Sequence, residues 1–218
     1  MNFNRLATVA LAPIVAVSVA GCGINSVPTA EENAKAKWAS VQADYQRRAD
    51  LIPNLVETVK GYAKQESTVL TQVTEARAKA TSVQISAADL QDPAKVAQFQ
   101  QAQGALSQSL GRLLATVEAY PDLKSSQNFL ALQSQLEGTE NRINVSIKDY
   151  NQAVQTYNTT IRTFPDAIGA KIFYGAKPMV TYQATAPNAD RAPTVNFDTG
   201  AANSNVPAKA PATAPAAN

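Results

Sequence analysis

Histidine is absent from all 218 residues of the sequence. Because histidine is the usual general base near neutral pH and the commonest metal ligand, His-based catalytic triads and His-ligated metal sites are excluded. Cys22 is the single cysteine, so the chain cannot form an internal disulfide. The Gly-x-Ser-x-Gly, Ser-x-x-Lys and Gly-rich phosphate-loop motifs do not occur either. We therefore expect no cofactor, no metal and no enzymatic activity of the usual kinds.

An excess of positive charge is also lacking. The 19 Lys and Arg residues nearly balance the 17 Asp and Glu residues, the net charge is +2, and no basic cluster occurs. Nucleic acid requires a concentrated positive face, so we expect no nucleic-acid partner. Glu137 and Glu140 share a helix face, but a di-iron bundle places a histidine three residues after such a glutamate. We interpret this pair as part of a solvated face.

The N-terminus, residues 1–21, has the features of a lipoprotein signal peptide. The apolar run that follows Arg5 is too short for a secure transmembrane span. It ends in Val19-Ala20-Gly21-Cys22, which looks like a bacterial lipobox, in which the cysteine thiol accepts diacylglycerol. We predict that Cys22 carries palmitate-type acyl chains and that residues 22–30 form a lipidated tether. An uncleaved signal anchor is the alternative.

The predicted location follows from this anchor. A lipid on Cys22 would place the chain on the extracytoplasmic side of a membrane. Gly23 follows the cysteine where an acidic residue would favour retention at the inner membrane. In a cell with two membranes we therefore expect the periplasmic face of the outer membrane.

A seven-residue apolar repeat predicts one long helix over residues 31–81. One row of the repeat is Trp38, Tyr45, Ile52, Val59, Glu66, Val73 and Ala80, and the other is Val41, Arg48, Leu55, Tyr62, Val69 and Ala76. Pro53 should kink this helix, because proline lacks an N–H and clashes with the carbonyl of Ala49. The simpler interpretation of Arg48 and Glu66 is that both charges reach solvent. Buried polar contacts that fix helix register are the alternative.

Three further helices are expected. Asp92 as N-cap and Pro93 at the first helical position begin a helix over residues 93–119. After a break at Tyr120-Pro121, a third helix spans residues 124–164 and a short one spans residues 167–174. An extended segment, residues 178–197, should lie against the bundle, and residues 200–218 should be disordered. The fold class is an all-α, antiparallel up-and-down bundle of three long helices plus a short one, with its domain over residues 31–182 and a tail over residues 183–218.

Tyr150-Asn151 and Tyr157-Asn158 form a repeated pair. The two pairs are seven residues apart, so both rings lie on one helix face with the two amides beside them. Large core residues whose hydroxyls find a polar partner are the simpler interpretation. The functional alternative is a polar groove that recognises another helix or a peptide.

Several motifs resemble the LemA family of bacterial envelope proteins. They are Arg47-Arg48, Asp50-Leu51-Ile52-Pro53-Asn54-Leu55, Glu75-Ala76-Arg77, Tyr120-Pro121-Asp122-Leu123-Lys124, Leu136-Glu137 with Glu140, Tyr150-Asn151, Tyr157-Asn158 and Phe164-Pro165. The resemblance covers residues 31–182 and implies an antiparallel, four-helix type bundle without an established biochemical activity. It also implies a set of candidate residues for interaction or for helix register, namely Arg47, Arg48, Asp50, Pro53, Asn54 and the two Tyr-Asn pairs. Ser146 to Asp149 departs from the family, which usually has an arginine there.

Two packing expectations follow from these helices. A hairpin about residue 88 brings Glu66 near Arg112 and predicts an ion pair between them. The helix over 31–81 is much longer than its neighbour, so residues 31–49 are either covered by the far end of the third helix or left as a free stalk. We favour the stalk, because the third helix should run away from this segment. Its stripe of Trp38, Val41 and Tyr45 is too apolar to remain exposed to solvent, so we expect self-association or a protein partner there.

The function that we expect is protein–protein interaction or scaffolding by a lipid-anchored bundle. A ligand-sensing bundle with a pocket between helices is one alternative. A carboxylate-based envelope hydrolase is another. An enzyme needs converging acids, a sensor needs an apolar cavity, and a scaffold needs an exposed stripe.

Overall fold

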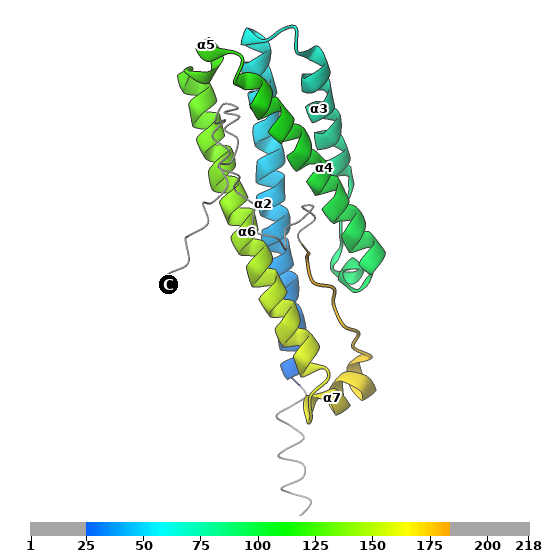
Figure 1. Ribbon diagram of the computed structural model, residues 1–218. Coiled ribbons are helices and arrows are strands. Elements are labelled where there is room, and N and C mark those ends of the chain that lie inside the picture. Colours follow the sequence, from blue (N-terminus) through cyan, green and yellow to red (C-terminus); the bar gives the residue numbers. More distant parts are fainter. Residues whose placement is uncertain (1–24, 184–218) are drawn as a thin grey trace, which may run out of the picture. The chain divides into compact units, whose positions relative to one another are not determined.

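The computed structural model describes residues 25–183, and within that range it contains helices and extended segments but no strand. The all-α prediction is confirmed. The long helices are α2 (Ser26–Tyr62), α3 (Ser67–Ser82), α4 (Pro93–Val117) and α6 (Gln127–Thr160) (Figure 1). The short elements are the 3₁₀ helix η1 (Ala87–Gln91), α5 (Pro121–Lys124), α7 (Asp166–Gly169) and the π-helical turn η2 (Ala170–Tyr174). The signal peptide, Cys22 and the tail from residue 184 lie outside the described residues.

The first helix differs from its predicted bounds at both ends. It begins at Ser26, within the expected tether, and Val27 is fully buried. It continues through Pro53 but ends at Tyr62, so the single helix over residues 31–81 is wrong. The chain turns over residues 63–66, and α3 then runs back beside α2. The seven-residue repeat continues without a break from α2 into α3 because both helices turn their apolar faces toward the same core. Gly61, in the last turn of α2, was the local signal of the end.

Helices α2 and α6 pair along most of their length. Residues of α2 in rising order meet residues of α6 in falling order, which makes the pair antiparallel. Lys37 Nζ lies 3.1 Å from Asp149 Oδ2, Ser146 donates a hydrogen bond to Asp44, and Arg48 Nη1 lies 3.0 Å from Glu140 Oε1. Because the turn after Tyr62 reverses the chain, α6 covers the N-terminal half of α2 as well.

The free stalk over residues 31–49 is therefore wrong. Trp38 is 2% exposed, and its ring centroid lies 5.4 Å from that of Phe99 and 5.1 Å from that of Tyr150. Val41 and Tyr45 are buried too. The apolar stripe packs inside the chain's own bundle, which removes the reason for expecting self-association or a partner through this segment.

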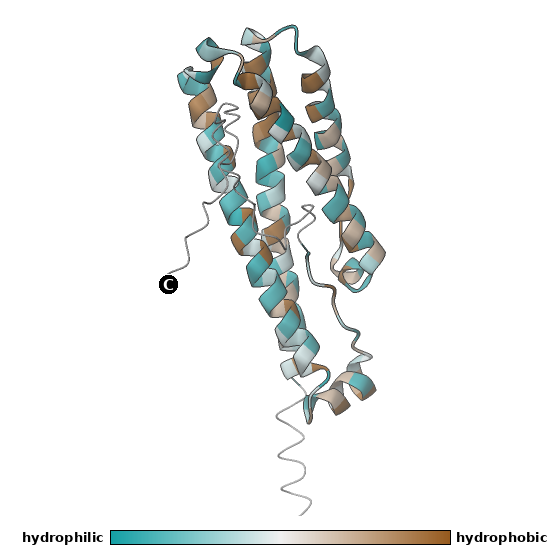
Figure 2. Ribbon diagram, viewed as in Figure 1, coloured by the Kyte–Doolittle hydropathy of each residue, from teal (hydrophilic) through white to brown (hydrophobic). Residues whose placement is uncertain are grey.

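Two apolar clusters form the core. The first surrounds Trp38 and joins α2 and α6 to the start of α4 and to the extended segment before residue 184. The second begins at Ile52 and joins the remaining half of α2 to α3, α4, α5 and the start of α6. Figure 2 shows hydrophobic residues as interrupted stripes along the helices, as expected for amphipathic helices. Arg48 lies between Tyr45 of the first cluster and Ile52 of the second.

Side-chain caps explain where α4 and α6 begin. Asp92 Oδ1 accepts a hydrogen bond from Ala94 N at 2.9 Å, which confirms the predicted N-cap. Ser126 Oγ accepts from Phe129 N at 3.2 Å, so α6 begins at Gln127 and α5 stands apart from it. The predicted helix over residues 124–164 is shorter for that reason.

The predicted pair between Glu66 and Arg112 is not among the ion pairs of residues 25–183. Instead, the Tyr120 hydroxyl donates to Glu66 Oε1 at 2.9 Å, and Gln65 Nε2 donates to the same hydroxyl at 3.0 Å. The connection between α3 and α4 contains η1 and extended residues, so the two helices meet in a different register from a hairpin about residue 88.

Candidate functional site

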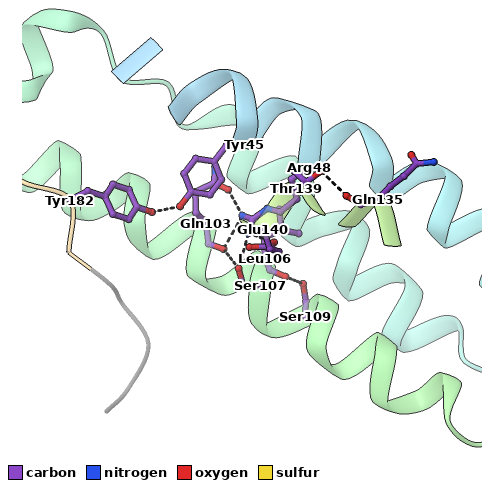
Figure 3. A network of polar contacts seen from close by, with 10 residues as sticks. All are labelled: Tyr45, Arg48, Gln103, Leu106, Ser107, Ser109, Gln135, Thr139, Glu140 and Tyr182. Atoms are coloured by element: carbon purple, nitrogen blue, oxygen red, sulfur yellow. Dashed lines mark hydrogen bonds and ion pairs between the residues drawn. The ribbon is translucent and has the colours of Figure 1, made fainter. Parts of the chain in front are cut away.

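Arg48 joins three helices at the junction of the two apolar clusters (Figure 3). It is 1% exposed. Its Nη1 donates to Ser107 Oγ at 2.9 Å and to Glu140 Oε1 at 3.0 Å, and its Nη2 donates to Gln103 Oε1 at 2.6 Å. The interpretation that Arg48 reaches solvent is wrong, and the alternative of a buried polar contact is correct for this residue.

The chemistry of this contact requires a guanidinium. One planar group reaches a carboxylate, an amide and a hydroxyl in different directions, which the compact ammonium of lysine cannot do. Its central carbon also lies 4.9 Å from the centroid of the Tyr45 ring, within cation–π range. The buried Arg48 Nε has no hydrogen-bond partner within the described part of the chain. Arg48 therefore fixes the register of α2, α4 and α6.

Pro53 creates a second polar contact through the backbone. Proline has no N–H, so the carbonyl of Ala49, four residues earlier, loses its helical donor. Arg77 of α3 supplies a replacement, because its Nε donates to the Ala49 oxygen at 2.7 Å. The helix thus passes through Pro53 with this carbonyl satisfied, and the same hydrogen bond ties α3 to α2.

The two Tyr-Asn pairs of α6 bind the extended segment of the chain that precedes residue 184. Each asparagine side chain makes two hydrogen bonds with the main chain of one residue. Asn158 accepts from Met179 N at 2.9 Å and donates to its carbonyl at 2.9 Å. Asn151 accepts from Tyr182 N at 2.7 Å and donates to its carbonyl at 2.8 Å. The amides therefore replace the partners that a neighbouring β-strand would provide.

The tyrosines complete this Tyr–Asn ladder, which we define as Tyr150, Asn151, Tyr157 and Asn158. The hydroxyl of Tyr157 donates to the carbonyl of Lys177 at 3.1 Å, and that of Tyr150 donates to the carbonyl of Val180 at 2.8 Å. Seven residues of helix rise about 10.5 Å, and three residues of extended chain span about 10 Å. The helical repeat of seven thus matches an extended repeat of three, which explains why both pairs bind equivalent positions.

Tyr182 connects the Tyr–Asn ladder to Arg48. Its hydroxyl shares a hydrogen bond with that of Tyr45, with an oxygen–oxygen distance of 2.5 Å. Burial raises the pKa of Tyr45 and of Tyr182 above the ordinary tyrosine value, and burial raises the pKa of Tyr150 as well. All three hydroxyls are therefore neutral donors and acceptors at neutral pH.

Comparison with known proteins then identifies the family. The family model described as "LemA family" matches residues 37–197, which is more than half of the chain. The chain belongs to the LemA family. The match includes Arg48, Pro53, Arg77 and the whole Tyr–Asn ladder.

Three curated relatives of this LemA-family chain are each 27% identical to it. Magnetosome protein MamQ 1 of Paramagnetospirillum magneticum and magnetosome protein MamQ of Magnetospirillum gryphiswaldense match over 157 residues, which is 65% of this chain and 58% of each relative. Protein LemA of Metamycoplasma hominis matches over 125 residues, which is 57% of this chain and 52% of the relative. The chain thus matches little more than half the length of these relatives.

The other candidate residues of the LemA motif lie on the outer face of α2. Arg47, Asp50, Pro53 and Asn54 are exposed. Gln46 Nε2 donates to Asp50 Oδ1 at 2.8 Å along the helix. Arg48 alone of these residues enters the core, while Pro53 acts through the backbone. The predicted lipidation site, Cys22, lies outside the described residues.

The described residues offer little for catalysis. Within residues 25–183 no group of three or more Cys, Asp or Glu side chains is placed to hold a metal ion. In the same range, no helix combines the length and the apolar character that crossing a membrane requires. One groove of about 470 Å³ opens between α4 and α6, and one of about 330 Å³ opens beside α2 and α3.

Sequence analysis missed most partners of the buried polar groups. Gln103 interrupts the apolar face of α4, and a polar residue at such a position indicates a buried contact. Apart from its place in a family motif, nothing in the sequence indicated the role of Arg77. The N–H that it replaces is missing at Pro53, which lies 24 residues earlier in the chain. Tyr182 follows the last helix, where no periodicity constrains its position.

Proposed function

We propose that this LemA-family chain is a lipid-anchored scaffold of the bacterial envelope that works by binding another protein. The observation that carries the proposal is the groove between α4 and α6. Its lining is Ser107, Leu110, Gly111, Leu114, Gln133, Leu136, Glu137, Glu140 and Asn141. Three of these residues, Leu136, Glu137 and Glu140, belong to the family motifs, and Glu137 is exposed.

The shape of this groove fits an amphipathic helix. Leu110 and Leu114 are four residues apart on α4, and Gln133 and Glu137 are four apart on α6, so each wall presents one helix face. No atom lies within 4 Å of a Cβ added to Gly111, which leaves the floor open to a closely packed helix. Exposed Glu137 provides negative charge at the rim. We therefore expect a partner helix with apolar residues on one face and a lysine or arginine beside it.

The competing functions find less support. A carboxylate-based hydrolase would need acids that converge in a cleft, whereas this groove contains Glu137 and a Glu140 that pairs with Arg48. A sensor would need an enclosed apolar cavity, whereas the groove between α4 and α6, the groove beside α2 and α3, and a third groove between the start of α2 and the end of α6 all open to solvent. A helix-binding groove fits the observed lining better than either of these.

Anchoring rests on the lipobox at residues 19–22. We expect radiolabelled palmitate to be incorporated into the chain in cells, and Cys22→Ser to abolish both the label and the processing of the precursor. A Cys22→Ser variant that matures to the same size and still takes up label would refute the anchor. In a cell with two membranes, we expect the label to fractionate with the outer membrane.

Photocrosslinking in intact cells tests the groove. A photoreactive residue at Gln133 should give a discrete adduct, and mass spectrometry of the crosslinked peptide should identify a basic amphipathic helix. Gly111→Phe places a ring at the groove, and its Cβ meets no atom within 4 Å, so this variant should abolish the adduct. Gly61→Phe is the matched control, because it also has no atom within 4 Å of its added Cβ but lies on α2, outside the groove. An adduct that survives Gly111→Phe would refute the proposed site.

A further inference from the structure

An apolar cap lies at the end of the bundle where α7 and η2 follow α6 (Figure 1). The described part of the chain exposes eight large hydrophobic side chains, and five of them fall within residues 164–174. These five define the apolar cap. They are Phe164, Ile168, Ile172, Phe173 and Tyr174, with exposed fractions of 78, 52, 69, 67 and 42%.

This exposure reverses the usual pattern of a surface helix. Gly169 and Ala170 are buried, so α7 and η2 already have an inner face. On the outer face, where polar residues are expected, Ile168 and Ile172 follow one another at a spacing of four. Contiguous exposed apolar residues on a folded domain mark a contact with another surface.

The segment that contains the apolar cap, residues 161–177, carries an excess of positive charge. Arg162, Lys171 and Lys177 are exposed, and Asp166 is the one acid between residues 161 and 177. Three positive charges minus one negative charge leave an excess of +2. Aromatic rings and aliphatic side chains flanked by basic residues are typical of segments that rest on an anionic lipid surface.

The position of the anchor identifies that surface. Ser26 Oγ donates to Asp166 Oδ1 at 2.6 Å, so the start of α2 adjoins the start of α7. Cys22 lies four residues before Ser26, and four residues span at most about 14 Å. A lipid on Cys22 therefore brings the bilayer surface within about 14 Å of Ser26, beside the apolar cap.

We propose that the apolar cap rests on the lipid surface and is a second membrane contact beside the acylated cysteine. This inference rests on the proposed lipid anchor. The acyl chains of a diacylglycerol on Cys22 hold the protein on the membrane at one point, and an apolar cap on the same surface adds buried apolar area to that attachment. Two contacts also restrict how the bundle tilts, which would keep the groove between α4 and α6 at a set orientation to the membrane. A second copy fits less well, because two caps face to face would oppose their positive charges.

Depth-dependent fluorescence tests the apolar cap. With Cys22 acylated, Ile172→Cys provides the one free thiol for an environment-sensitive probe, and the exposed Val145→Cys on α6 provides the matched control. Each labelled lipoprotein is reconstituted into vesicles of phosphatidylcholine and phosphatidylglycerol, with and without spin-labelled lipid. We expect a blue-shifted emission at position 172 that spin-labelled lipid quenches, and neither effect at position 145. Unchanged Trp38 fluorescence shows that both variants are folded.

The outcomes separate this inference from the anchor. If Cys22 is acylated but the probe at position 172 shows the same emission and quenching as the probe at position 145, the membrane contact is refuted and the anchor remains intact. A blue shift at position 172 that spin-labelled lipid does not quench means that protein covers the cap, and it also refutes the proposal. Absence of palmitate label refutes the anchor itself, and this is measured on the same preparation without the probe.

Discussion

Because Arg77 replaces the N–H that Pro53 lacks, we predict that mutations of these two residues have non-additive effects on the free energy of unfolding. Arg77→Met removes the donor that lies 2.7 Å from the carbonyl oxygen of Ala49. Ala49 is 3% exposed, so this carbonyl is left without a partner in the core. A hydrogen bond that involves a charged group contributes about 1.5–3 kcal/mol. We therefore expect Arg77→Met to lower the free energy of unfolding by about 2 kcal/mol.

Pro53→Ala should weaken that effect. Alanine restores an N–H four residues after Ala49, so the helix itself satisfies the carbonyl. The proline in a helix interior also costs up to about 3 kcal/mol relative to alanine, so Pro53→Ala alone should stabilise α2. On that background we expect Arg77→Met to cost only about 1 kcal/mol, the ordinary value for a hydrogen bond whose loss leaves no buried group unsatisfied. The coupling between the two sites is then about 1 kcal/mol.

Urea unfolding of the four proteins of the cycle measures this coupling. Fluorescence of Trp38, which is buried between α2 and α6, follows the transition. Arg112, an exposed arginine on α4, provides the control, because Arg112→Met and Pro53→Ala should be additive within about 0.5 kcal/mol. If Arg77→Met costs the same with and without Pro53, the Ala49 carbonyl does not connect the two residues and the reasoning fails.

Three further predictions follow from the polar contacts of α6. Arg48→Ala should lower the free energy of unfolding by about 3–5 kcal/mol, because it removes three hydrogen bonds of a buried guanidinium and leaves a cavity. The neighbouring exposed Arg47→Ala should change it by less than about 0.5 kcal/mol, and equal urea midpoints would contradict this. Asn158→Leu removes both hydrogen bonds to Met179 and should cost about 1–3 kcal/mol. It should also speed hydrogen exchange at the Met179 amide, which donates to Asn158, whereas the exposed Gln155→Leu should not. Burial raises the pKa of Tyr45, Tyr150 and Tyr182, so the stability that they contribute is complete below the ordinary tyrosine pKa of about 10 and falls as the pH rises above it. Urea midpoints that stay constant above about pH 10 would contradict the burial of these hydroxyls.

Local signals in the sequence predicted local structure well. Asp92-Pro93 begins a helix as predicted because the cap depends on residues within one turn. Most residues in the two rows of the heptad repeat are buried, because periodicity reports which face is buried, but Tyr62 is half exposed. Periodicity does not report direction. The turn over residues 63–66 leaves the phase of the repeat unchanged and was therefore not predicted. The antiparallel pairing of α2 and α6 that buries Trp38 depends on this turn and was not predicted either.

The candidate site was predicted in part. The spacing of the Tyr-Asn pairs placed four side chains on one helix face. The simpler interpretation applies, since the rings fill the core while the hydroxyls and amides bind an extended segment of the same chain. The segment that the Tyr–Asn ladder binds was not predictable, because residues 176–183 have no periodicity that would indicate packing against α6. Arg48 was assigned correctly only as the less favoured alternative, because solvation is the usual state of a charged residue.

Three polar residues of the family motifs, Arg77, Asn151 and Asn158, share one physical role in this chain. Each stands where the backbone departs from regular helix and supplies the hydrogen bond that the departure removes. Arg77 replaces the N–H that Pro53 lacks, and Asn151 and Asn158 pair the main chain of a segment that has no strand beside it. A residue engaged in this way is not free to bind a partner. Contacts with other molecules are therefore expected where side chains remain exposed, namely at the groove between α4 and α6, which includes Glu137, and at the apolar cap, which includes Phe164.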